Sequence, residues 1–150
     1  MGKENIFMGA DHAGFLLKEY LLLYLEKKGY DVKDLGAYAF NKSDDYPDFA
    51  SAVGKSVSKH KNSFGILVCG SAQGMCIAAN KIRGIRAVAV ESVKDAAITR
   101  THNNANVLCL SGWHLPEEKA VQIAQTFLTT RFSNASRHKR RLRKIAKLER

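Results

Sequence analysis

A cysteine followed by a glycine-rich turn is the feature of this sequence best suited to chemistry. The apolar run at residues 64–68 leads into Cys69 and a turn that contains Gly70 and Gly74, after which a second apolar stretch begins. A turn that joins a buried parallel strand to a helix directs several backbone N–H groups into one space, and the helix dipole adds positive charge there. We therefore expect the turn to bind an anion, either a phosphate or the oxyanion of a reacting sugar.

Cys69 itself has two interpretations. At the end of a strand and close to a helix N-terminus, a thiol has a lowered pKa, so its reactive thiolate is accessible near neutral pH. Cysteines are also among the most buried residue types, and many act as small hydrophobic side chains. We apply the second interpretation to Cys76 and Cys109, because both lie inside apolar runs. For Cys69 both interpretations stay open.

The elements that must position this turn follow from the pattern of apolar residues. Short apolar runs predict strands, and longer segments with apolar residues at helical spacing predict helices. The two alternate throughout, which indicates a three-layer α/β/α sandwich on a mostly parallel sheet, in one domain over residues 1–150. The predicted strands are residues 5–8, 30–35, 64–69, 85–90 and 107–110. The predicted helices are residues 15–28, 47–60, one from 75, 93–101, 116–130 and a basic helix from about 134.

Ligands of such sheets bind beyond the carboxyl ends of the strands. Asp11 and His12 follow the first predicted strand and the Cys69 turn follows the third, so these side chains are expected to share one pocket. His102 and Asn103 precede the fifth strand instead, at the opposite end of the sheet or on a loop that folds over it. Either a second subunit or a long loop could bring them to the pocket.

The composition is that of a globular protein with reduced thiols. Of the 150 residues, 45% are hydrophobic, which is enough for a core. Three cysteines without a C-x-x-C pair argue against a disulfide framework and against a zinc site. No apolar run reaches the roughly 18 residues that a membrane span needs, and the first residues lack the pattern of a signal peptide. We therefore expect a soluble, cytoplasmic protein without a membrane partner.

The positive charge is concentrated at the end of the chain. Residues 131–150 contain 9 Lys and Arg against 1 acidic residue, so they account for +8 of the net charge of +10. The first 130 residues are nearly neutral, with 15 basic and 13 acidic side chains. A nucleic-acid-binding surface is usually a basic patch on a basic domain. We therefore favour a solvated helix face or a local anionic ligand over nucleic acid for this tail.

Several short motifs occur in a specific order along nearly the whole chain. They are GADHAG at residues 9–14, DYP at 45–47, CGS at 69–71 with Gly74, IAANK at 77–81, GIRA at 84–87, HN at 102–103, NVL at 106–108 and RH at 137–138 with Arg141. Each is weak alone, but together the chain resembles the ribose-5-phosphate isomerase type B family, which also contains galactose-6-phosphate and allose-6-phosphate isomerases. The resemblance implies an aldose–ketose isomerase that interconverts ribose 5-phosphate and ribulose 5-phosphate through an enediolate.

The same resemblance implies an architecture and an assembly. The fold would be a Rossmann-like three-layer sandwich on a five-stranded sheet. The protein would be a homodimer or a dimer of dimers whose active sites lie at the subunit interface, so that His102 serves the neighbouring chain's pocket. No cofactor and no metal are expected, because a base and an oxyanion hole together suffice for moving a proton between adjacent carbons.

Catalytic roles follow from the family's motifs. Cys69 matches the base that takes the carbon-bound proton. The backbone N–H groups between Gly70 and Gly74, with the Ser71 hydroxyl, would hold the enediolate oxygens, although Ser71 can also cap a helix. His102 matches the residue assigned to ring opening, since a histidine both takes and gives protons near pH 7. Asp11 would bind sugar hydroxyls, but without the family it would be taken for a turn residue.

Substrate-binding roles are implied in the same way. His12, Arg137 and Arg141 match the residues that hold the substrate phosphate. The two arginines are four residues apart and so share one face of a helix. Tyr46 and Asn103 would line the pocket.

Two positions depart from the family pattern. Trp113 stands where many members have an arginine that binds phosphate, which puts phosphate affinity or substrate size in question. Ala72 stands where glycine is common. Because alanine is strained at a positive φ, we expect an ordinary turn at Ala72.

Two other functions stay open. A six-carbon sugar phosphate, allose or galactose 6-phosphate, is the alternative within the class. Galactose-6-phosphate isomerases divide the site between two different subunits, whereas Cys69, His102 and the arginines occur together here, which favours a self-sufficient homodimer. From a different class, a non-catalytic nucleotide- or nucleic-acid-binding α/β protein would explain the glycine turn and the basic tail. It would leave Cys69, His102 and Asp11 without a role.

Overall fold

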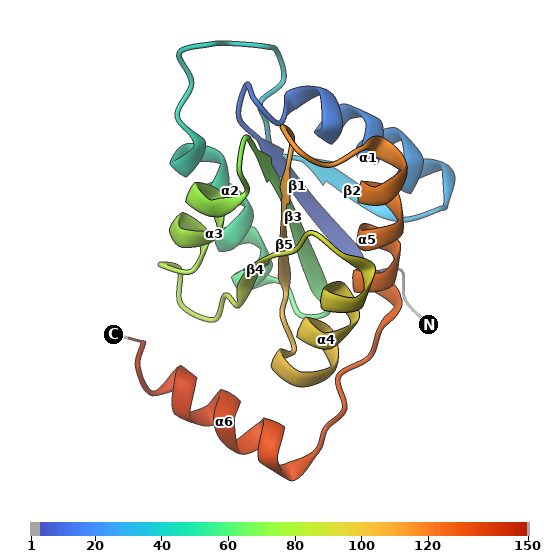
Figure 1. The fold of residues 1–150 in the computed structure, drawn as a ribbon. Coiled ribbons are helices and arrows are strands. Elements are labelled where there is room, and N and C mark those ends of the chain that lie inside the picture. The colour runs from blue at the N-terminus through green and yellow to red at the C-terminus, as the bar shows by residue number, and fades with distance from the viewer. Residues whose placement is uncertain (1–3, 150) are drawn as a thin grey trace.

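The computed structural model describes residues 4–149 and is built on one parallel sheet (Figure 1). The strands lie in the order β2-β1-β3-β5-β4, and each neighbouring pair is parallel. This confirms the predicted five-stranded sheet. Its strands are β1 (Asn5–Ala10), β2 (Asp31–Asp34), β3 (Ser63–Cys69), β4 (Ala87–Ala89) and β5 (Val107–Ser111).

Helices cover both faces of the sheet, which confirms the three-layer sandwich. Figure 1 shows α1, α4 and α5 on one face and α2 and α3 on the other. The helices are α1 (Phe15–Lys27), α2 (Tyr46–Lys59), α3 (Gln73–Ala79), α4 (Val93–Asn103), α5 (Glu117–Thr129) and α6 (Ser136–Ala146). None of the helices in residues 4–149 combines the length and the apolar character needed to cross a membrane.

The central strand explains how the two layers of core are kept apart. Every residue of β3 is buried, and successive side chains alternate between the faces. Ile66 and Val68 pack with α1, α4 and α5, whereas Leu67 and Cys69 pack with α2 and α3. Gly65 allows the second layer to approach, because a Cβ there would lie 2.7 Å from a methyl group of Val53. Cys69 therefore ends a strand that is fixed on both sides.

Helix α4 differs from its predicted bounds, and helix α3 is only partly covered by the core. Helix α4 continues to Asn103 and ends at Asn104, which takes the left-handed conformation with φ 45°. His102 and Asn103 are therefore helical, whereas the predicted helix ended at Thr101 and left both residues outside it. Helix α3 is only partly buried: Met75 and Ala79 face the core, but Ile77 is exposed.

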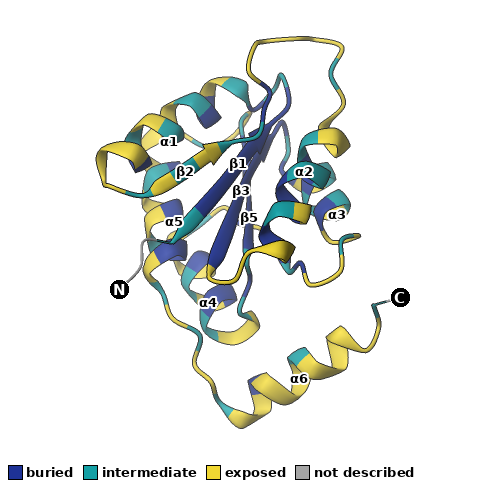
Figure 2. Cartoon of the chain, turned by 180° about the vertical axis from the view of Figure 1, so that it is seen from behind, coloured by how far each residue is buried: buried dark blue, intermediate teal, exposed yellow. Residues whose placement is uncertain are grey.

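Helix α6 stands apart from the sandwich. It packs against α4 below the amino ends of the strands, and most of it is coloured as exposed in Figure 2. His138 is its only buried residue. Beyond the helix, the Glu149 carboxylate accepts a hydrogen bond from the backbone N–H of Gly84, at 2.8 Å. The predicted basic helix from about residue 134 is thus an arm held at its two ends.

Candidate active site

Seven of the predicted site residues meet at the carboxyl ends of β1 and β3. They line a small cavity of about 220 Å³ together with Ala13 and Trp113. Larger hollows lie elsewhere, one of about 420 Å³ around Arg86 and Arg100 at the opposite end of the sheet, but that one contains none of the predicted site residues. The seven residues that share the small cavity, called the thiol pocket below, are Asp11, His12, Tyr46, Cys69, Gly70, Ser71 and Gly74.

Cys69 lines the thiol pocket and is only 4% exposed. Burial raises the pKa of Cys69, and the negative charge of Asp11 raises it further. The backbone N–H groups of Met75, Ala72 and Ser71 point at the sulfur and lower the pKa, but they do not offset the burial. The predicted lowered pKa is therefore wrong for this structure, because desolvation of the thiolate outweighs the effect of the turn.

Strand β5 holds the turn after Cys69 in place. The N–H of Gly112 donates to the Cys69 carbonyl at 2.8 Å, and the N–H of Trp113 donates to the Gly70 carbonyl at 3.2 Å. The Ser111 hydroxyl also donates to the Gly70 carbonyl, at 2.6 Å. These hydrogen bonds from Ser111 and from the two residues after β5 fix the path of the turn beside the Cys69 sulfur.

The prediction of an ordinary turn at Ala72 is wrong. Ala72 is buried and has φ 68°, in the left-handed region. This conformation lets the chain turn from β3 into α3 within three residues, and for a non-glycine residue it costs roughly 1–2 kcal/mol. The Ser71 hydroxyl accepts a 3.4 Å hydrogen bond from the Gln73 N–H, but Ala72 occupies the N-cap position of α3, which has no side-chain cap.

Two aromatic rings form walls of the thiol pocket, and each requires a glycine. A Cβ on Gly70 would lie 2.5 Å from the ring of Trp113, and a Cβ on Gly74 would lie 2.6 Å from the ring of Tyr46. Real Cβ atoms do not approach that closely, so the two glycines let the rings lie directly on the turn. Trp113 is nonetheless 69% exposed, so the rim of the pocket carries an uncharged aromatic ring.

A hydrogen bond from the backbone fixes the position of the Asp11 carboxylate. One carboxylate oxygen accepts a hydrogen bond from the Gly14 N–H at 3.0 Å, which is the turn role that the sequence allows. Burial raises the pKa of Asp11, while the Gly14 hydrogen bond and the nearby His12 act in the opposite direction. The carboxylate still lines the pocket, so the turn role and a substrate-binding role are compatible.

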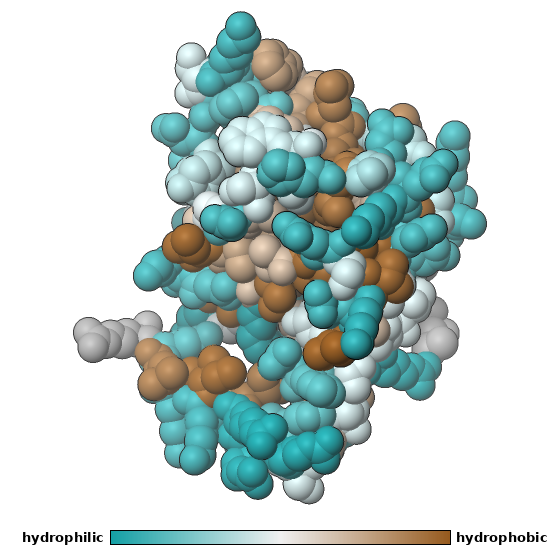
Figure 3. Space-filling model, viewed as in Figure 1, coloured by the Kyte–Doolittle hydropathy of each residue, from teal (hydrophilic) through white to brown (hydrophobic). Residues whose placement is uncertain are grey.

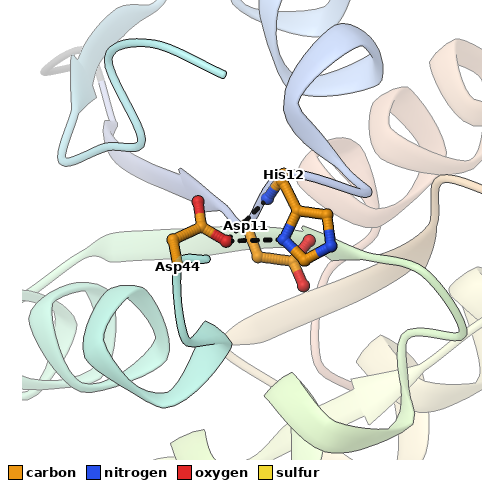
Figure 4. Close-up of side chains that lie close together, drawn as sticks. All are labelled: Asp11, His12 and Asp44. Carbon is orange, nitrogen blue, oxygen red and sulfur yellow. Dashed lines mark hydrogen bonds and ion pairs between the residues drawn. The ribbon is translucent and has the colours of Figure 1, made fainter. Parts of the chain in front are cut away.

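His12 is paired with Asp44, a residue that sequence reasoning missed. Asp44 Oδ1 lies 2.7 Å from His12 Nδ1 and accepts a hydrogen bond from the His12 backbone N–H at 3.0 Å (Figure 4). The hydrogen bond to Asp44 raises the pKa of His12. The signal for Asp44 in the sequence is weak. It is an acidic residue in the polar loop before Tyr46, and such loops commonly contain acidic residues.

Three side chains among the described residues are close enough together to be considered as metal ligands: Asp11, His12 and Asp44. Each offers one ligand atom, and the three atoms lie within 4.8 Å of one another. The Nδ1 atom of His12 is already engaged by Asp44, however, so these side chains form a hydrogen-bonded cluster and not an open set of ligands.

The other four predicted site residues lie at the opposite end of the sheet. His102 and Asn103 end α4, Arg137 and Arg141 lie on α6, and all four are exposed. Within one chain the structure does not bring them to the thiol pocket. We call these four residues the basic cluster.

A buried histidine anchors the basic cluster. The rings of His102 and His138 have centroids 4.5 Å apart, and the Ser133 hydroxyl lies 2.6 Å from His138 Nδ1. Burial lowers the pKa of His138, and the charges of Arg137, His102 and Arg141 lower it further. His138 is therefore the buried side chain around which the exposed groups are arranged.

The remaining two cysteines form a pair. Cys109 is fully buried in β5, as predicted, and burial contributes to the raised pKa of its thiol. Cys76 is only partly buried, and its Sγ atom donates to the Ala87 carbonyl at 3.2 Å. The neighbouring Cys109 thiol is the main cause that lowers the pKa of Cys76 to about 7. The prediction that both are inert core residues is therefore incomplete for Cys76.

Comparison with known proteins gives one consistent result. The family described as Ribose/Galactose Isomerase matches residues 6–145. A ribose-5-phosphate isomerase B of Mycobacterium tuberculosis is 38% identical over 100% of this chain and 93% of its own length. The crystal structure of ribose-5-phosphate isomerase B from Mycoplasma genitalium with bound ribulose-5-phosphate is 42% identical, covers 99% of this chain and 97% of its own, and has a TM-score of 0.94. The Thermotoga maritima ribose 5-phosphate isomerase structure is 45% identical, covers 97% and 99%, and has a TM-score of 0.93.

Proposed function

The chain belongs to the ribose/galactose isomerase family, and from this premise we propose that it interconverts ribose 5-phosphate and ribulose 5-phosphate. The observation that carries the proposal is the thiol pocket itself. A thiol, a carboxylate and a histidine meet beside the turn between β3 and α3, in a cavity of about 220 Å³. The relative from Mycoplasma genitalium, whose crystal structure contains ribulose-5-phosphate, supports the choice of a five-carbon substrate.

Cys69 acts as the base in this proposal. The open-chain aldose loses its C2 proton to the Cys69 thiolate, and the electron pair moves to give an enediolate across C1 and C2. The hydroxyl proton on O2 then moves to O1, which shifts the negative charge to O2. The Cys69 thiol returns its proton to C1 as the carbonyl forms at C2, which gives the ketose and regenerates the thiolate. The base and the N–H donors are both supplied by the chain, so we include no cofactor and no metal in the proposal.

The raised pKa of Cys69 is compatible with this role. A buried thiol is mostly protonated at neutral pH, so the thiolate forms at a cost. The N–H groups of Met75, Ala72 and Ser71 point at the sulfur and reduce that cost once the charge has formed. They leave fewer donors for the enediolate oxygens than the sequence implied, so the Ser71 hydroxyl carries a larger share of that contact.

A second copy of the chain completes the site in this proposal. His102 would open the sugar ring, and Arg137 and Arg141 would hold the phosphate together with His12. All three contributed side chains are exposed on α4 and α6, where another molecule can reach them. Their distance from the thiol pocket within one chain supports a homodimer, or a dimer of dimers, with shared sites.

The test is a comparison of substrates. Rates of isomerisation are measured with ribose 5-phosphate, allose 6-phosphate and galactose 6-phosphate under the same conditions. We expect kcat/KM to be highest for ribose 5-phosphate. A clear preference for either six-carbon substrate would move the assignment to that sugar, and inactivity on all three would remove the isomerase proposal.

A further inference from the structure

Asp44 has no role in the chemistry described so far, yet it is buried against that site. It lies in the loop between β2 and α2, and its side chain is only 9% exposed. Both hydrogen bonds of its Oδ1 atom go to His12, one to the ring and one to the backbone N–H. Its Oδ2 atom is buried without a hydrogen-bond partner among the described residues. The hydrogen bonding of this carboxylate is therefore directed entirely at one histidine.

The geometry determines which nitrogen of His12 carries a proton. An ionised carboxylate only accepts hydrogen bonds, so the Nδ1 atom that faces Asp44 must be the donor. In the neutral ring the other nitrogen, Nε2, is then an acceptor. Figure 4 shows this second nitrogen on the side of the ring away from Asp44. Nε2 becomes a donor only when the ring is an imidazolium cation.

A phosphate dianion offers oxygen atoms that accept hydrogen bonds. Neutral His12, with Nε2 unprotonated, would turn an acceptor toward those oxygens and would repel them. The imidazolium form offers both a positive charge and an N–H donor, which is the stronger type of contact. Holding a phosphate at His12 therefore depends on the protonation state that Asp44 favours.

We propose that Asp44 is a positioning residue that orients the His12 ring and keeps it cationic, so that His12 can bind the substrate phosphate. This inference rests on the proposed function, since it assumes that a sugar phosphate enters the thiol pocket. It adds a residue that acts through His12 and does not itself touch the substrate.

The charges around His12 favour the same state. The hydrogen bond to Asp44 is the main cause of the raised pKa of His12; partial burial opposes it, and the charges of Asp11 and Asp44 add to it. The other titratable groups of the thiol pocket are Tyr46 of α2 and Cys69 of β3, and neither is a cation. No Lys or Arg from the described residues lines this cavity, so His12 is the one group of its own chain able to meet the phosphate with a positive charge.

The loop that carries Asp44 is held by a second buried charge. Lys18 is fully buried in α1, and its Nζ atom donates to the Asp34 carboxylate at 2.8 and 2.9 Å and to the Ala37 carbonyl at 2.6 Å. The loop then enters α2 at Tyr46, whose ring lies on Gly74. The two ends of the loop that carries Asp44 are thus held against the sandwich, which supports a positioning role for a residue of this loop.

The sign of the pH dependence follows. His12 is cationic below its raised pKa and loses its charge as the pH rises through that value. Without the Asp44 charge the pKa falls, and phosphate binding is lost at a lower pH. The phosphate of the substrate has its own pKa of about 6, but it is the same for every variant, so differences between variants belong to the protein.

The experiment compares Asp44→Asn with Asp48→Asn, which removes the same charge from an exposed position in the first turn of α2. The pKa of His12 is measured by NMR titration of the histidine ring protons, and a His12→Gln variant identifies the signal among the five histidines. KM and kcat for ribose 5-phosphate are measured from pH 6 to 9. We expect Asp44→Asn to lower the His12 pKa and to raise KM at pH 7.5 roughly tenfold, with kcat much less affected.

Asp48→Asn is expected to change neither quantity, and Asp44→Glu, which keeps the carboxylate, is expected to recover part of the KM. An unchanged His12 pKa in Asp44→Asn would overturn the inference, as would a KM effect equal to that of Asp48→Asn. Titration with inorganic phosphate separates this inference from the proposed function. If the wild type does not isomerise ribose 5-phosphate but phosphate binding still weakens in Asp44→Asn, the function is wrong and the role of Asp44 stands.

Discussion

The thiol pocket and the basic cluster are built in opposite ways. The thiol pocket lies where parallel strands end; its thiol and the Asp11 carboxylate are buried, and its turn is bonded to β5. The basic cluster lies at the other end of the sheet, on the ends and faces of two helices, and its side chains are exposed. Figure 3 shows hydrophilic side chains gathered over the outward side of α6, at the lower edge of the molecule.

The difference suggests that the thiol pocket suits proton transfer within one chain, whereas the basic cluster suits contact with a neighbouring chain. Buried groups of the thiol pocket have fixed distances and altered pKa values, which proton transfer requires. The exposed arginines and the exposed histidine of the basic cluster lie away from any cavity that contains the Cys69 thiol in their own chain. The comparison therefore favours a site that is assembled from the thiol pocket of one chain and the basic cluster of another.

The largest expected effect comes from removing the thiol. Cys69→Ala should lower kcat for ribose 5-phosphate by about 10²–10⁴-fold, because that is the usual loss when a general base is removed. Substrate should still bind, since the phosphate contacts remain. Cys76→Ala is the matched control, and its rate should stay close to that of the wild type. A Cys69→Ala enzyme with more than about a tenth of the wild-type kcat would mean that the thiol is not the base.

Mixing two inactive variants tests whether the two regions belong to one site. In a two-fold symmetric dimer, a Cys69→Ala chain and a His102→Ala chain together contain one intact thiol pocket facing one intact histidine. Random assortment of equal amounts should restore about a quarter of the wild-type activity, since half of the dimers are mixed and each has one complete site. If subunit exchange is verified and no activity returns, His102 does not act across an interface.

The arginines of the basic cluster should affect binding more than turnover. Arg137→Ala or Arg141→Ala should raise KM about tenfold or more, because a charge-assisted contact contributes roughly 1.5–3 kcal/mol. Neutralising Lys139, Arg140 and Lys147 together should change KM little, because exposed, distant charges are screened by salt.

The same two sets of variants distinguish the enzyme from a nucleic-acid-binding protein. Binding of DNA or RNA is titrated at two salt concentrations beside the KM measurements. Equal KM values in both sets, combined with tight and salt-dependent nucleic-acid binding, would contradict the phosphate role of the two arginines.

The smallest effect concerns the reactivity of the thiols in the free enzyme. The raised pKa of Cys69 means that its thiolate fraction, and so its rate of alkylation by iodoacetamide, should keep increasing up to tenfold per pH unit between pH 7 and pH 8.5. Cys76, with a pKa of about 7, should react faster at neutral pH and level off above it. Mass spectrometry of the modified peptides gives both rates. A Cys69 rate that is flat over this range would show a thiol that is already ionised.

The sequence predicted the parts of the structure that depend on local pattern and on parallel-sheet geometry. Strands and helices alternate with clear apolar periods, so the five strands and their layers could be predicted. Because the carboxyl ends of parallel strands meet at one edge, Asp11, His12 and Cys69 could be expected to share a pocket. The end of α4 was less predictable, because the helix continues past Thr101 and is terminated only by the left-handed conformation of Asn104.

What the sequence could not predict depends on tertiary burial. The direction of the Cys69 pKa is decided by how closely α2, α3 and β5 surround the sulfur, and no local pattern encodes that. The positive φ of Ala72 follows from the path between β3 and α3, whereas the alanine itself favours an ordinary turn. The role of Asp44 depends on a contact across 32 residues of sequence, which only the folded loop creates.

The arm formed by α6 has a consequence for local stability. His138 holds it to α4 near its start, and Glu149 holds it to Gly84 beyond its end, while its middle turns bury little apolar surface. Its free energy of local opening is therefore lower than that of β3, so the arm can unfold and exchange its amide hydrogens while the sheet stays intact. In the proposed dimer the neighbouring chain would cover this arm, and mass action would then stabilise it. The order of the tail would thus depend on protein concentration, whereas the thiol pocket would be formed in every folded chain.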